Sequence, residues 1–116
     1  MSESYEREKL ASAVSALASG APIQKRLEYA WMAMHTLKNH GFTNPERQAE
    51  YESIYDRLTA DKSDPQRGHV PTTTAQLSDE EAQEIARDIV DLNTSLNRNR
   101  IWALEDEIRQ LKTERK

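Results

Sequence analysis

Apolar residues recur along this chain at intervals of three and four, the spacing of one face of an α-helix. Three such runs lie between residues 4 and 60, and no run alternates apolar with polar residues as a β-strand would. The three faces are Leu10, Ala13, Val14 and Leu17; Ile23, Leu27, Ala30, Trp31, Met34 and Leu37; and Tyr51, Ile54, Tyr55 and Leu58. The pattern predicts an all-α protein in which residues 4–60 form a small antiparallel three-helix bundle.

Turn-forming residues separate these three runs. Gly20 and Pro22 divide the first from the second, and Gly41 ends the second near residue 40. The third run begins in one of two ways. Either Thr43 caps it with Glu46 reaching back, or Asn44 caps it with Pro45 in the first turn.

The next segment, residues 61–77, carries no helical pattern. It holds two Pro, one Gly and three Thr, and Val70 is the only sizeable apolar residue before Leu77. We therefore expect a linker or a strap that crosses the surface of the bundle.

A fourth pattern fills residues 78–115. It opens with a capping box between Ser78 and Glu81, which Leu77 precedes. Two apolar stripes follow. The second has steps of 3, 4 and 3 residues, which is the spacing of a coiled-coil seam. The first consists of Ala82, Ile85, Ile89, Leu92 and Leu96, and the second of Ile101, Leu104, Ile108 and Leu111.

The polar stretch NTSLNRNRIW, residues 93–102, lies between the two stripes. Its Asn, Ser and Thr residues cost a helix about 2 to 3 kcal/mol in total, and Gly and Pro are absent from residue 77 onward. We favour one long amphipathic helix from about residue 79 to 114, bent near 97–99, with Arg100 occupying one position of its seam. The alternative is two helices that meet near Asn97–Asn99.

A long helix of this kind would expose its last apolar residues unless another surface covered them. The residues expected to bind a partner are Leu96, Arg100, Ile101, Trp102, Leu104, Ile108 and Leu111. A second copy of the chain is the simplest partner, because two-fold dimers are the commonest assembly. Net charges of −5 over residues 78–91 and +2 over 92–116 would suit antiparallel pairing. In the alternative, the same residues fold back onto the bundle of their own chain.

The composition restricts the class of protein. Hydrophobic residues make up 36% of the chain and charged residues 31%, so the core must be thin or completed by a partner. The net charge of −4 argues against broad nucleic-acid binding, and no run approaches the ~20 apolar residues of a membrane span. With no Cys and an acidic N-terminal segment, the chain suits a cytoplasmic location.

Residues with catalytic potential are few. His35 and His40 are five positions apart and cannot share a helical face, and His69 lies in the expected linker, so we expect no metal. The spelling EExxE at residues 80–84 is similar to the first half of the metal motif of all-α nucleoside triphosphate pyrophosphohydrolases. The second half, ExxD on a following helix, is missing. Four carboxylates could nevertheless face Mg²⁺ on one side of a helix, namely Glu81, Glu84, Asp88 and Asp91.

These observations favour a non-enzymatic module for oligomerisation or protein–protein interaction, acting through its C-terminal helix without a cofactor or a small-molecule substrate. A Mg²⁺-dependent nucleotide hydrolase that uses residues 80–91 is one alternative. The other is a small nucleic-acid-associated regulator, in which Arg98 and Arg100 would contact phosphates and Trp102 would stack on a base.

Overall fold

The structure, a computed structural model, describes residues 4–114 of the 116-residue chain, and no β-strand occurs among them. The helices are α1 (Ser4–Leu17), α2 (Ile23–Met34), α3 (Leu37–His40), α4 (Pro45–Leu58), α5 (His69–Thr74) and α6 (Asp79–Glu114). The all-α class and the long C-terminal helix are thereby confirmed.

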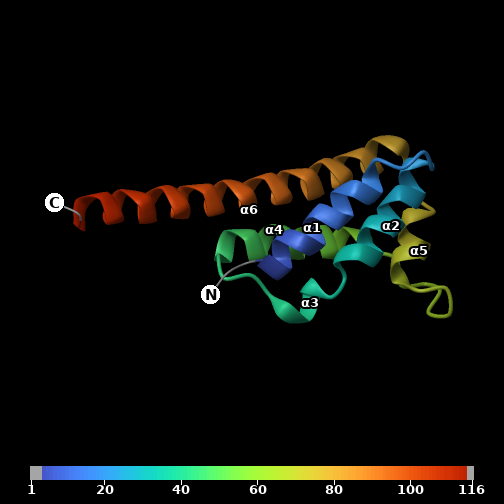
Figure 1. Cartoon of the computed structure of the whole chain (residues 1–116). Coiled ribbons are helices and arrows are strands. Elements are labelled where there is room, and N and C mark those ends of the chain that lie inside the picture. Colours follow the sequence, from blue (N-terminus) through green and yellow to red (C-terminus); the bar gives the residue numbers. More distant parts are fainter. Residues whose placement is uncertain (1–3, 115–116) are drawn as a thin grey trace.

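The hydrophobic core lies between α1, α2, α4 and the first half of α6 (Figure 1). α1 and α2 pack along each other, and α6 contacts both of them as well as α4. The contribution of α6 is its first apolar stripe, every member of which is at most 3% exposed: Ala82, Ile85, Ile89, Leu92 and Leu96. The core is therefore shared between residues 4–60 and the first half of α6.

Local capping residues set where α4 and α6 begin. The side chain of Asn44 accepts a hydrogen bond from the backbone N–H of Glu46, with Pro45 in the first turn, which decides between the two predicted starts of α4. At the start of α6, the Ser78 hydroxyl accepts from the N–H of Glu81 while the Glu81 carboxylate accepts from the N–H of Ser78. This is the predicted capping box.

The second predicted helix is divided in the structure into α2 and α3. The buried Tyr51 hydroxyl donates a 3.0 Å hydrogen bond to the carbonyl of Met34, the last residue of α2. Lys38, whose N–H would bond that carbonyl in a continuous α-helix, donates instead to the carbonyl of His35. A tyrosine of α4 thus takes the place of one backbone bond where the helix breaks.

The expected linker or strap, residues 61–77, contains the short helix α5. Its buried residues are Val70, Thr72, Thr73 and Thr74. Thr73 Oγ1 accepts from the backbone N–H of Asp61 at 2.9 Å, and Thr74 Oγ1 donates to Glu28 Oε1 at 3.0 Å. Because hydroxyls with hydrogen-bond partners can be buried, this segment packs against α2 and α4 without an apolar stripe of its own.

α6 runs without a break through residues 93–102, as the favoured prediction had it, and Figure 1 shows no sharp bend there. Its 36 residues span about 54 Å at 1.5 Å per residue, most of the molecule's longest dimension of 63 Å. The chain's fold is therefore a compact helical body from which one helix projects. Across residues 4–114, no helix combines the length and the apolar character needed to cross a membrane.

Candidate functional site

The second half of α6 leaves the bundle after Leu96, the last buried residue of the core. Near this point Arg47 of α4 donates a 3.3 Å hydrogen bond to the side chain of Asn99. Every residue from 101 to 113 is exposed, and Figure 1 shows this part of the helix extending beyond the other helices. Within the chain that the structure describes, nothing covers it.

Four large apolar side chains form a regular line on this projecting segment. They lie at successive steps of three, four and three residues, and their exposed fractions range from 37% to 57%. We call this line the distal strip; it consists of Ile101, Leu104, Ile108 and Leu111. Because the segment is helical throughout, the four side chains share one face. A regular apolar line of this length is unlike the scattered apolar residues of an ordinary protein surface.

The distal strip does not continue the face of α6 that is buried in the core. Four residues beyond Leu96, that face passes through Arg100, and three further on through Ala103. The strip begins one residue later, at Ile101, so it is rotated about 100° around the helix. The sequence predicts one seam through Leu96, Arg100 and Leu104, but in the structure Leu96 and Leu104 belong to two separate faces of α6. One faces the bundle, and the other is presented beside it.

The residues expected to bind a partner occupy different places on α6. Leu96 is fully buried in the bundle and offers no surface. Arg100 is partly exposed and lies next to the distal strip. Trp102 is 58% exposed, but two residues past Arg100 it lies on the other side of the helix from the strip. The structure thus groups the four strip residues with Arg100 and separates Leu96 and Trp102 from them.

All four carboxylates considered for Mg²⁺ lie on α6, and two of them are engaged with the protein. Glu81 takes part in the capping box, and the hydrogen bonds from Ser78 hold the pKa of its carboxyl below the ordinary value. Asp88 accepts from the guanidinium of Arg57 at 2.6 Å. Among residues 4–113 no three His, Asp or Glu side chains are placed to hold one metal ion together.

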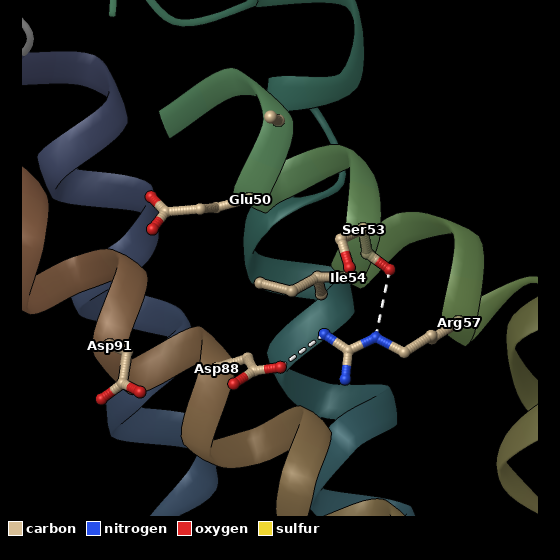
Figure 2. Close-up of a pocket in the computed structure, with 7 residues that line it drawn as sticks. Glu50, Ser53, Ile54, Arg57, Asp88 and Asp91 are labelled. Carbon is tan, nitrogen blue, oxygen red and sulfur yellow. Dashed lines mark hydrogen bonds and ion pairs between the residues drawn. The ribbon is translucent and has the colours of Figure 1, made fainter. Parts of the chain in front are cut away.

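A cleft of about 380 Å³ lies between α4 and α6 beside this ion pair, and Figure 2 shows how its side chains meet. Arg57 reaches from α4 to Asp88 on α6 and also donates from Nε to the carbonyl of Ser53 at 3.2 Å. Glu50 and Asp91 line the same cleft. The ion pair joins the two helices across the cleft and engages Arg57, the basic side chain that lines it.

One buried acidic residue was not anticipated from the sequence. Glu6 of α1 is only 4% exposed and contacts Nε2 of His40, while its other carboxylate oxygen is buried without a hydrogen bond. The sequence held a sign of this, because Glu6 precedes Leu10 by four residues and so lies on the buried face of α1. The rings of Tyr5 and His40 lie beside it, tilted by 42° with centroids 4.7 Å apart.

Comparison with protein-family models, with curated proteins and with solved structures finds no match for this chain.

Proposed function

We propose that this protein is a non-enzymatic assembly module whose helical bundle holds α6 so that the distal strip can bind a second copy of the chain. The observation that carries the proposal is the line of four half-exposed apolar side chains on a helix that has left its own core. Covering such side chains on association removes apolar surface from water, which is the main favourable contribution to most protein interfaces.

The bundle supports this role by forming the helix in advance. An isolated helix of some 15 residues is marginal in water, because its first turn is costly to nucleate. Here residues 100–113 continue a helix whose first half is buried against α1, α2 and α4. Association therefore needs to order less of the chain than the folding of a free peptide would, and this lowers the cost of binding.

A truncation tests the proposal. A chain that ends at Asn99 keeps every core residue of α6, since Leu96 is the last of them, and loses the whole distal strip. Static light scattering coupled to size-exclusion chromatography should give twice the 13.3 kDa chain mass for the full protein and the monomer mass for the truncated one.

Two outcomes would count against self-association through the distal strip. The full chain could remain a monomer at all concentrations reached, or the truncated chain could keep the dimer mass. If the full chain is monomeric but binds a different protein through the strip, then that protein, and not a second copy of the chain, is the partner. Circular dichroism of the truncated chain serves as the control for folding of the bundle.

A further inference from the structure

Isoleucine and leucine alternate along the distal strip. In heptad notation Ile101 and Ile108 occupy the a positions, and Leu104 and Leu111 occupy the d positions. β-Branched residues at a with Leu at d favour two parallel strands over other coiled-coil states. The strip therefore resembles the seam of a two-stranded parallel coiled coil two heptads long.

The charged residues that flank the strip distinguish between orientations. Arg100 and Glu107 occupy g positions, and Glu105 and Lys112 occupy e positions. In a parallel, in-register pair each g residue lies beside the e residue of the next heptad on the other helix. Arg100 then meets Glu105 of the second copy, and Glu107 meets Lys112 of the second copy. Both contacts join opposite charges, and two-fold symmetry repeats each of them.

The antiparallel arrangement of the same strip brings like charges together. If Ile101 lies beside Leu111 of the second copy, the centre of the pair falls at residue 106. Each e position then faces an e position, and each g position a g position, so Glu105 meets Glu105 and Glu107 meets Glu107. Arg98 would in turn approach Lys112. Such exposed pairs add little affinity, so their effect is to select the orientation.

The four flanking side chains are available for these contacts. Across the part of the chain that the structure describes, Arg100, Glu105, Glu107 and Lys112 take part in no ion pair. The acidic residues nearer the bundle, which suggested antiparallel pairing in the sequence, lie elsewhere on α6. Asp88, for example, points to α4 and pairs with Arg57 there.

A polar residue marks the end of the strip that is nearest to the bundle. Asn97 lies four residues before Ile101 on the same face, is exposed, and donates to the side chain of Asn93 at 3.5 Å. In a parallel pair this d position would face its own equivalent. The register-fixing Asn of coiled coils lies at an a position, so this d-position pair forms only a polar end to the apolar seam.

Together these features point to a parallel, in-register two-stranded coiled coil formed by residues 97–111 of two copies, an inference that rests on the self-association proposed above. Both bundles then lie at the same end of the assembly, and both C-termini at the other.

Single cysteines in the full-length protein test the orientation, because the natural chain has none. In a parallel pair, Leu111→Cys places two d-position sulfurs side by side, whereas in the antiparallel pair the two sites are about 15 Å apart along the axis. Glu105→Cys does the reverse, since an e position faces its own equivalent only in the antiparallel pair. Trp102→Cys, on the other side of the helix, is the control for random collision.

After equilibration in a glutathione redox buffer, the inference predicts that most of the Leu111→Cys chain runs at twice its mass on a non-reducing gel. Glu105→Cys and Trp102→Cys should stay largely monomeric on the same gel. Light scattering of each reduced variant shows whether it still self-associates.

A dimer in which Glu105→Cys crosslinks, or in which neither Leu111→Cys nor Glu105→Cys does, overturns the parallel arrangement and leaves self-association intact. A reduced Leu111→Cys chain that has become monomeric makes the charge exchange Arg100→Glu with Glu105→Arg decisive. In a parallel pair Glu105→Arg alone faces Arg100 of the second copy and weakens association, and adding Arg100→Glu restores it. In the antiparallel pair residue 105 meets its own equivalent, so Glu105→Arg replaces one like-charge contact with another and no such loss and rescue is expected. If the unmodified chain is itself monomeric, both proposals fail.

Discussion

Replacing Leu104 and Ile108 with serine removes the centre of the distal strip and leaves the bundle untouched. The two side chains are 37% and 52% exposed, so each has roughly half of its surface left to bury. Full burial of a Leu or Ile side chain contributes about 1.5 to 3 kcal/mol, and half of that is about 1 kcal/mol. Since both copies lose both side chains, the dimer should be weakened by about 4 kcal/mol, or roughly three powers of ten in Kd.

Sedimentation equilibrium over a concentration series measures this Kd directly. The matched control places serine at Trp102 and Ala103, which are exposed on the other side of the same helix and face no partner in the proposed pair. It introduces the same two serines, and so a comparable penalty in helix propensity, without touching the strip. The control should dimerise about as tightly as the natural chain.

Two results would refute this reasoning. An unchanged Kd for the Leu104→Ser, Ile108→Ser chain would mean that the strip contributes nothing to association. An equal loss in the Trp102 and Ala103 control would mean that the effect comes from weakening the helix, or that the partner binds the opposite face. Circular dichroism of both variants reports whether α6 is retained.

Three further predictions concern the bundle. Leu92→Ala deletes a side chain that is 1% exposed at the contact of α6 with the core, and should lower the free energy of unfolding by about 2 to 5 kcal/mol in urea melts; a loss below 1 kcal/mol would place α6 outside the cooperative core. His40→Ala leaves the buried Glu6 carboxylate without its partner and should cost about 1 to 3 kcal/mol, whereas Glu6→Met should cost less; the reverse order would contradict the account of this pair. Because folding lowers the pKa of Glu81, the stability from its capping contact is present above the ordinary value of 4.5 and is lost as pH falls through the lowered folded value. Glu81→Gln removes the titrating carboxyl and should therefore flatten the acid side of a plot of melting temperature against pH, and an unchanged slope would show that this contact is absent.

Much of the helical architecture follows from patterns that are local in the sequence. Apolar spacing located α1, α4 and α6, and the capping residues Asn44 and Ser78 fixed two helix starts to within a residue. The continuity of α6 was predictable because a few tenths of a kcal/mol for each Asn or Ser do not stop a helix that lacks Gly and Pro. Each of these inferences needs only neighbouring residues.

The features that were missed depend on contacts between distant segments. At the break after Met34, the carbonyl of that residue accepts from the hydroxyl of Tyr51, which is 17 residues away. Helix α5 is held by threonine hydroxyls that bond to Asp61 and Glu28, and a Thr-rich segment gives no apolar pattern from which that packing could be read. Sequence spacing alone does not reveal partners of this kind.

The exposed distal strip can be predicted only in part from the sequence, for the same reason. The steps between Ile101, Leu104, Ile108 and Leu111 are visible in the sequence, and the structure places all four on one exposed face. The one-residue offset between the two stripes of α6 separates Leu96 and Trp102 from this face. That offset matters only once the first stripe is known to be buried against the bundle.

Hydrogen exchange measured at several protein concentrations tests most directly whether a second chain covers the distal strip. In dilute solution the backbone amides of residues 101–111 should exchange rapidly, because a helix end without tertiary contacts opens easily, while those of residues 82–96 stay protected. As concentration rises, protection of residues 101–111 should increase in step with the dimer fraction, and that of residues 82–96 should change little. Exchange in residues 101–111 that stays the same at every concentration would contradict the account.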